Sequence, residues 1–267
     1  SKADLSPHTD IKFGFYTILL SECKCEAYAY GHQCCDFSDG TLVCLTPGES
    51  ISMKENNKEF PSKGWILAFH PDLICGTPLG LNIHNYTFFS YCPEEALHLS
   101  LREKQIILEF LERIRQELER CIDRHSKKII SKYIELLLDY CTRFYERQFI
   151  TRSEVNKKVF REFNHLLDNH FNVKVSLSTD VLSDEYCANL LHLSPAYFND
   201  LLKYEIGKEF KEYIQFKRFE IAKGWLVNTD KTLGQIAQEL GFSNSQYFSR
   251  LFKKITGCSP NEFRMPN

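Results

Sequence analysis

The stretch "GFSNSQYFSRLFKKITGCSPNEFR", Gly241–Arg264, decides how this sequence is interpreted, because its framework occurs twice. The stretch "LHLSPAYFNDLLKYEIGKEFKEY", which begins at Leu191, carries the same framework fifty residues earlier. The matched pairs are Tyr197 with Tyr247, Phe198 with Phe248, Leu201 with Leu251, Lys203 with Lys253, Gly207 with Gly257, Glu212 with Glu262, and Tyr213 with Phe263. One supersecondary unit is therefore predicted to occur twice.

Each copy is predicted to contain an apolar helix, a short turn and a second helix. In the later copy, apolar residues between Leu233 and Leu240 recur at helical spacing. Gly241 follows them where a left-handed residue would end the helix. Asn244 in the later copy and Ser194 in the earlier one are predicted to cap the second helix.

The second helix of the later copy is predicted to have one apolar and one polar face. The apolar face is predicted to contain Phe248, Leu251, Phe252 and Ile255. The polar face is predicted to contain Ser245, Gln246, Ser249, Arg250, Lys253 and Lys254. Amide and guanidinium groups pair with base edges in the major groove of DNA, and lysines bind phosphates. For a single such helix, an ordinary amphipathic surface helix would be the preferred interpretation. Because the unit occurs twice, the helix is predicted to recognise DNA.

The corresponding helix of the earlier copy is less basic. The positions predicted to face DNA are Ala196, Asn199, Asp200 and Lys203, and Asp200 takes the place of Arg250. Asn199 is suited to adenine, and Asp200 could accept a hydrogen bond from cytosine. Alternatively, Asp200 is a solvated acidic residue beside loosely bound DNA. The two copies are therefore not expected to contribute equally.

The motif "IAQELGFSNSQYFSRLFKKITGCSPNEFR" resembles the DNA-binding region of bacterial AraC/XylS transcription regulators. The matching residues are Ile236, Ala237, Gly241, Phe242, Tyr247, Phe248, Phe252, Lys253, Gly257, Pro260 and Arg264. Phe210–Leu226 resembles the helix that joins the two helix-turn-helix units of that family, with Arg218, Ala222 and Leu226 in the expected places. The resemblance covers about 160–264. It implies regulation of transcription through promoter or operator DNA, a cupin-like effector domain, a homodimer, and RNA polymerase as a further partner.

Residues 1–99 are predicted to form a β-rich domain, which the resemblance identifies as cupin-like. Short β-type segments separated by turns are typical of a β-sandwich or small barrel. These segments are "FGFYTILL", "CEAYAY", "TLVCL", "ISMKE", "GWILAFH" and "YTFFSY".

From Leu101 the apolar spacing becomes helical, and two stripes predict an antiparallel hairpin over 100–150. The stripes are Ile107, Phe110, Leu111, Ile114, Leu118 and Cys121, and then Ile130, Ile134, Leu137, Leu138, Cys141 and Phe144. The resemblance gives helices 101–149 the role of dimerisation. Residues 151–159 are predicted to be a charged linker, and 160–267 an all-α DNA-binding domain with helix-turn-helix units at about 180–207 and 231–257. The chain is thus predicted to be α+β.

A pocket for a small apolar or sugar-like effector is the hypothesis for four N-terminal aromatic residues, with plain core packing as the alternative. These residues are Trp65, Phe69, Tyr86 and Phe88. The side chains of a conceivable metal site are His70, His84, His98, Cys75 and Cys92, but they lack the His-x-His grouping of metal-bearing cupins. The histidines are therefore predicted to be core residues, and no cofactor is expected. No nucleophile and base form a catalytic pattern, so an enzyme is not expected.

Two other functions remain as alternatives. One is a cupin-type metal enzyme that carries a DNA-binding domain. The other is a thiol sensor that uses Cys34 with Cys35, or Cys23 with Cys25. The eleven cysteines have no zinc-finger spacing, which favours reduced thiols.

The composition favours a folded protein with a local DNA-binding face. The 267 residues are 43% hydrophobic and 25% charged, with a net charge of −2. Residues 231–267 are locally basic, with five Lys/Arg against two Asp/Glu. Because no apolar run has bilayer-spanning length and no signal-peptide pattern is visible, a cytoplasmic location without a membrane partner is expected.

Overall fold

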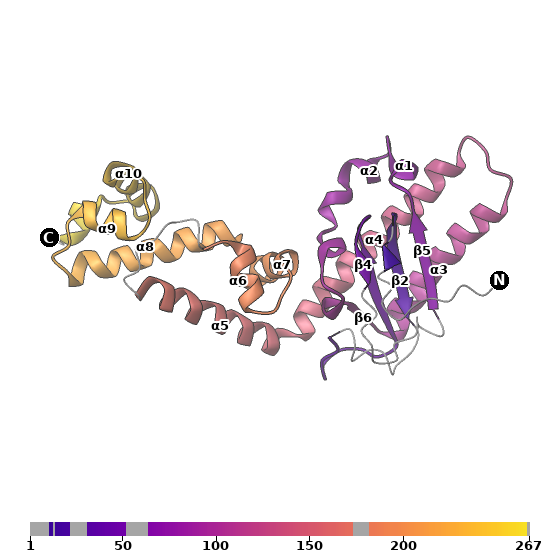
Figure 1. Ribbon diagram of the computed structural model, residues 1–267, viewed down its shortest axis with the longest axis horizontal. Coiled ribbons are helices and arrows are strands. Elements are labelled where there is room, and N and C mark those ends of the chain that lie inside the picture. The colour runs from indigo at the N-terminus through magenta and orange to yellow at the C-terminus, as the bar shows by residue number, and fades with distance from the viewer. Residues whose placement is uncertain (1–10, 13, 22–30, 52–63, 173–181, 266–267) are drawn as a thin grey trace. The chain divides into compact units, whose positions relative to one another are not determined.

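The computed structural model describes residues 11–12, 14–21, 31–51, 64–172 and 182–265 (Figure 1). The chain divides into two compact units, Ser1–Asn156 and Lys157–Asn267. The first unit combines antiparallel strands with helices, and the second is helical. At this level the prediction of an α+β chain with a helical C-terminal domain is confirmed.

Two antiparallel sheets are described in the first unit. The strands are β1 (Ile11–Lys12), β2 (Tyr16–Ser21), β3 (Gly40–Leu45), β4 (Ser50–Ile51), β5 (Gly64–Phe69) and β6 (Leu97–Leu99). The larger sheet has the order β5-β2-β3-β6, and β1 pairs with β4. In its register Ile18 of β2 lies between Cys44 of β3 and Leu67 of β5. All of β3 is buried, so both faces of the sheet are covered there.

The predicted strands in "FGFYTILL", "TLVCL" and "GWILAFH" are confirmed as β2, β3 and β5. The segment "CEAYAY" lies outside the described residues, and so does "ISMKE" after its first residue, which belongs to β4. Among the described residues of this unit the larger sheet has four strands, and the cupin-like sandwich remains a prediction.

The segment "YTFFSY" was wrongly predicted to be a strand. It contains a 3-10 helix, η3 (Thr87–Ser90), in which the adjacent Phe88 and Phe89 are both buried. Successive side chains of a strand point to opposite faces, whereas these two enter one aromatic cluster. Phe88 stacks on Phe89 and on Tyr145, with ring centroids 5.6 and 5.3 Å apart. The other short elements nearby are α1 (Pro71–Ile74), α2 (Pro78–Asn82), η2 (Ile83–Asn85) and η4 (Pro93–Glu95).

The predicted helical hairpin is present as α3 (Leu101–Glu119) and α4 (Ser126–Thr151), which lie side by side in Figure 1. All six residues of the second apolar stripe are buried, from Ile130 to Phe144. The prediction for the first apolar stripe is only partly confirmed, because Leu118 is 56% exposed. Cys121 is also exposed, since α3 ends at Glu119 and the stripe ends with it.

The stretch 151–159, expected as a linker, is largely helical. Helix α5 (Ser153–Asn172) begins within it, and the boundary between the units falls between Asn156 and Lys157. Further along, α5 contributes Phe163, Leu167 and Phe171 to the core of the second unit. One helix therefore carries the chain from the first unit into the second.

The second unit contains six further helices among its described residues. These are α6 (Asp184–Leu190), α7 (Pro195–Ile206), α8 (Phe210–Asn228), α9 (Leu233–Glu239), α10 (Ser245–Thr256) and α11 (Pro260–Arg264). Helix α8 contributes to two hydrophobic clusters, with Phe210 and Ile214 in one and Phe219 and Leu226 in the other. Across the ranges described, no helix has the length and apolarity that crossing a bilayer would require.

Candidate nucleic-acid interface

Helix α10 is held by a core that it shares with α8 and α9. Phe248 and Phe252 of α10 are fully buried, together with Ile236 of α9. Phe219 of α8 stacks on Phe248, with ring centroids 6.1 Å apart. The packing of these large rings fixes which side of α10 faces outward.

The outward side of α10 carries the polar residues predicted from its sequence. Gln246, Arg250, Lys253 and Lys254 are exposed. Ser245 and Ser249 are half-buried, and the Ser249 hydroxyl donates to the carbonyl oxygen of Ser245 at 2.8 Å. One guanidinium, two ammonium groups and one amide are thus available to an outside partner.

The apolar side of α10 is narrower than predicted. Ile255, assigned to the buried face, is 50% exposed. It lies in the last turn of the helix, and its near neighbours in sequence, Lys253, Lys254 and Gly257, are exposed as well. The core thus covers the middle of α10 and leaves its C-terminal turn open to solvent.

The predicted caps of both candidate recognition helices are confirmed. Ser194 Oγ accepts from the Tyr197 amide at 3.2 Å, and Asn244 Oδ1 accepts from the Tyr247 amide at 2.7 Å. Gly241 is left-handed, with φ of 74°, as predicted. Each cap satisfies an amide that the first helical turn leaves without a partner, which fixes where the helix begins.

Arg264 holds the end of the second helix-turn-helix unit together. Its Nε donates to the Leu226 carbonyl oxygen at 3.2 Å, and its Nη2 donates to the Lys231 carbonyl oxygen. The side chain therefore fastens α11 to the end of α8 and to the loop before α9. This arrangement gives Arg264 a structural role within the motif.

The proposed reading positions of α7 are less open than those of α10. Lys203 is exposed, whereas Ala196, Asn199 and Asp200 are half-buried. Asn199 Nδ2 donates to Asp184 Oδ2 of α6 at 2.9 Å. Asp184 could not be predicted from the repeated motif, because nothing in the motif shows that α6 and α7 bring these two side chains together.

The two units differ by one residue in their turns. The caps of α6 and α9, Ser183 and Thr232, are 49 residues apart, whereas the caps of α7 and α10, Ser194 and Asn244, are 50 apart. The left-handed residue of the first turn is His192, with φ of 57°, opposite Gly241 in the second. A constant fifty-residue shift therefore aligns the second helices correctly and the first helices one residue out of register.

The proposed effector residues do not form one accessible set. Phe69 and Phe88 are buried, and Phe69 stacks on Tyr16 with centroids 5.3 Å apart. Trp65 and Tyr86 are half-buried, and the Tyr86 hydroxyl donates to Asp139 Oδ1 at 2.8 Å. Phe69 and Phe88 therefore pack in the core of the first unit.

The histidines considered for a metal site are also dispersed. His98 is buried as predicted, but His70 and His84 are exposed, and His70 caps α1 by accepting from the Asp72 amide. Within the described ranges, no group of three His, Cys, Asp or Glu residues is placed to hold a metal ion.

The cysteine pair Cys34–Cys35 is exposed within a turn that Asp36 and Gln33 close, with the Asp36 amide 3.0 Å from the Gln33 carbonyl oxygen. Cys35 is nevertheless partly shielded from water, and this desolvation, together with the charge of Asp36, raises the pKa of its thiol and so disfavours the reactive thiolate. Cys23 and Cys25 lie outside the described residues.

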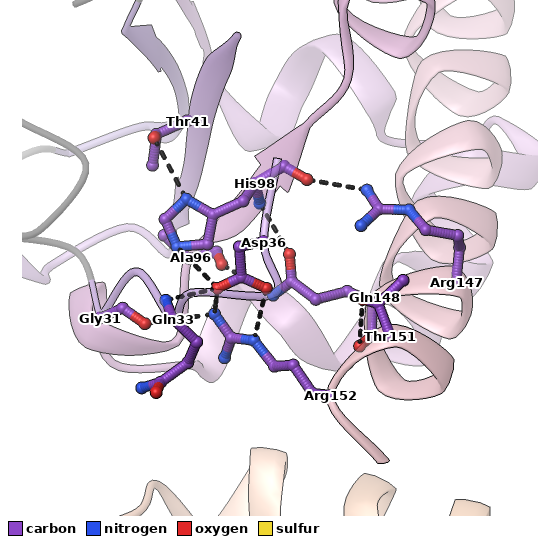
Figure 2. A network of polar contacts seen from close by, with 10 residues as sticks. All are labelled: Gly31, Gln33, Asp36, Thr41, Ala96, His98, Arg147, Gln148, Thr151 and Arg152. Atoms are coloured by element: carbon purple, nitrogen blue, oxygen red, sulfur yellow. Dashed lines mark hydrogen bonds and ion pairs between the residues drawn. The ribbon is translucent and has the colours of Figure 1, made fainter. Parts of the chain in front are cut away.

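The first unit contains a buried polar network at the end of α4 (Figure 2). Arg152 binds Asp36 through two hydrogen bonds, of 2.9 Å from Nε and 2.6 Å from Nη2, and the two side chains are 6% and 0% exposed. His98 lies beside this pair, with its Nε2 3.9 Å from Asp36 Oδ2. Burial works to raise the pKa of Asp36, but Arg152 outweighs it and holds that pKa below its ordinary value.

The family match lies within the second unit. The family model described as "Helix-turn-helix domain" matches residues 187–265. YtdP of Bacillus subtilis, an uncharacterised HTH-type transcriptional regulator, is 33% identical to this chain over 111 residues. The match covers 42% of this chain and 14% of YtdP. The arabinose operon regulatory protein of Salmonella typhimurium is 32% identical over 101 residues, covering 38% of this chain and 32% of that protein. The C-terminal unit is an AraC-type helix-turn-helix domain.

The likeness also extends beyond this AraC-type domain. YijO of Escherichia coli, an uncharacterised HTH-type transcriptional regulator, is 24% identical over 225 residues, which cover 84% of this chain and 76% of YijO. The chain spans less than half the length of several other curated relatives, at 14%, 21% and 41% of them. The matched relatives include several transcription regulators.

Proposed function

We propose that this protein is a sequence-specific transcription regulator that binds double-stranded promoter or operator DNA through α7 and α10. The observation that supports this most is α10 itself, whose apolar side is locked in a core while Gln246, Arg250, Lys253 and Lys254 face outward. Arginine and glutamine match base edges in the major groove, and lysines neutralise phosphates. A DNA partner implies a cytoplasmic location, with RNA polymerase as a further contact at a promoter.

In this proposal the first unit is a cupin-like sensor of a small effector. Its sheet is joined to α4 by the bonds of Arg147 and Gln148 to His98 of β6, and α4 is followed directly by α5, which enters the DNA-binding unit. Helices 101–149 are proposed to hold two copies of the chain together as a homodimer. A regulator of this kind would then place two AraC-type domains on one DNA site.

The test compares two substitutions on α10. Arg250→Ala is expected to relax specificity at one base pair and to cost about 1 to 3 kcal/mol on the selected site if the contact to guanine is bidentate. Lys253→Ala is expected to weaken binding to all DNA and to lower the slope of log K against log salt by about one unit. Binding is measured over a salt series, both on a site that the wild-type protein selects from a random DNA library and on random DNA.

Lys132→Ala is a suitable control, because it removes an exposed lysine from α4 in the other unit. It is expected to leave the salt slope unchanged. If Arg250→Ala and Lys253→Ala weaken selected and random DNA equally, α10 does not read bases and the proposed function loses its main support.

A further inference from the structure

A hydrogen bond between side chains joins the two helices of the first helix-turn-helix unit at its proposed reading face. Asn199 lies on α7, and its Nδ2 is 2.9 Å from Asp184 Oδ2 at the start of α6. Both side chains are half-buried. Apart from this bond, the structure gives the Asn199 side chain no hydrogen bond among the described residues.

The chemistry of this bond determines which way the Asn199 amide points. A carboxylate only accepts hydrogen bonds, so Asp184 can bind the NH2 end of the amide but not its carbonyl end. The amide carries two N–H groups, and this contact uses one of them. If that is the N–H opposite to the carbonyl oxygen, the other N–H and the oxygen remain together on the free edge. That donor and acceptor pair is what asparagine uses to bind N7 and N6 of adenine.

The neighbouring residues on α7 suit this orientation. Ala196 lies one turn before Asn199, and Lys203 lies one turn after it. A methyl group can contact the methyl group of thymine, and an exposed lysine can bind a phosphate. Asn199 is thus the one amide in the middle of a face that could lie along a groove.

The second unit has no equivalent of this pair. In the register of the helices, Asn199 corresponds to Ser249, whose hydroxyl bonds to its own helix at Ser245. Asp184 corresponds to Leu233, which packs against the hydrophobic core. The bond between α6 and α7 is therefore not a requirement of the helix-turn-helix fold, because α9 and α10 pack without it.

We propose that Asp184 is a positioning residue that orients the Asn199 amide to recognise adenine in the major groove. The inference rests on the proposed function and refines it, since it assigns one base contact to the first unit. The guanidinium of Arg250 would then read a second base through the other unit. Asp184 itself would not touch DNA.

The experiment uses the full chain and a library of random double-stranded DNA. Selection with the wild-type protein identifies a site, and affinities are then measured for every single base-pair change at one fixed salt concentration. Asn199→Ala is expected to remove a preference for adenine at one position, of roughly 5- to 150-fold. Asp184→Ala is expected to reduce the preference at that same position, and combining the two changes should add nothing to the loss caused by Asn199→Ala.

Two further variants separate positioning from charge and from folding. Asp184→Asn keeps a carbonyl oxygen that can accept from Asn199, so it is expected to retain most of the preference. Glu185→Ala removes the same charge from the neighbouring exposed residue of α6 and should alter binding to all sites alike. General loss of folding would also weaken all sites together and would not erase one base preference.

The proposal is overturned if Asn199→Ala leaves every base preference intact. It is equally overturned if Asp184→Ala acts on all DNA uniformly, as Glu185→Ala does. A wild-type chain that selects no sequence would instead contradict the proposed function itself, so the two failures can be distinguished.

Discussion

His192 and Gly241 occupy the same place in the two helix-turn-helix turns but have very different side chains. Their φ angles are 57° and 74°, both in the left-handed region. Glycine enters this region without steric cost, whereas a residue with a Cβ atom pays about 1–2 kcal/mol. Histidine enters it more often than most residues, so the cost at His192 lies toward the lower end. The first turn is therefore strained where the second is not.

Substitutions at these two positions are expected to have opposite effects. Gly241→Ala should lower the free energy of unfolding of the DNA-binding unit by about 1 kcal/mol or more, and His192→Gly should raise it by up to about 1 kcal/mol. Denaturant unfolding can be followed by Trp225 fluorescence in a Trp65→Phe background, since the sequence has two tryptophans. A stabilising Gly241→Ala, or a strongly destabilising His192→Gly, would contradict the argument from backbone conformation.

At the scale of elements, α4 completes the edge of the larger sheet. The Gln148 side chain accepts from the His98 amide at 2.7 Å and donates to the Ala96 carbonyl oxygen at 3.0 Å, as a neighbouring strand would do. Arg147 Nη2 donates to the His98 carbonyl oxygen at 2.7 Å. These side chains satisfy backbone groups of β6 and of Ala96 just before it, which would otherwise lie buried without partners.

The adjacent Asp36–Arg152 pair is expected to matter for the stability of the first unit. Arg152→Met leaves the Asp36 carboxylate buried without its partner and should cost about 3–5 kcal/mol. The double variant Asp36→Asn with Arg152→Met should cost less, because no buried charge remains. Trp65 fluorescence in a Trp225→Phe background measures both during denaturant unfolding.

The same pair predicts a dependence on pH with a defined sign. The pKa of Asp36 is lower in the folded state than its ordinary value, so its contribution to stability is present above that value. The contribution is lost as the pH falls through the lowered folded pKa. Arg152→Met should remove this part of the acid sensitivity. An unchanged pH profile, or equal losses in the single and double variants, would show that the ion pair does not control stability.

At the scale of the whole molecule, the proposed dimer must be tested with exposed residues of the hairpin rather than with the buried apolar stripe of α3. Ile114 is only 2% exposed, so a charge there would disrupt the core of the hairpin rather than an interface. Leu118 and Ile122, by contrast, are 56% and 79% exposed near the turn that follows α3. These two side chains could contact a second copy without unfolding the first.

Leu118→Glu combined with Ile122→Glu is expected to convert the proposed dimer into monomers, as measured by sedimentation velocity. Ile150→Glu is a matched control, because Ile150 is 60% exposed at the other end of α4. Both variants should keep wild-type helical content by circular dichroism. If the double variant still sediments as a dimer, the hairpin turn is not the main interface.

The sequence by itself determined the repeated unit, both helix caps and most of the packing of α10. Ser194, Asn244, Phe248 and Phe252 could be assigned in advance, because capping and helical periodicity depend on residues only a few positions apart. The exposed positions of Gln246, Arg250, Lys253 and Lys254 follow from the same periodicity. Local rules also identified the main strands in the described part of the sheet, where β-type segments end at turns.

Only the tertiary structure decided which distant side chains meet. Asn199 and Asp184 are 15 residues apart, and Arg152 and Asp36 are 116 apart. Tyr86–Tyr91 was mistaken for a strand because its aromatic residues gain their burial from a cluster that includes Tyr145, far along the chain. Such contacts depend on how complete elements pack, and packing is set by the shape of both partners at once. The pattern within one segment indicates its secondary structure and its apolar face. It does not show which distant element will pack against that face.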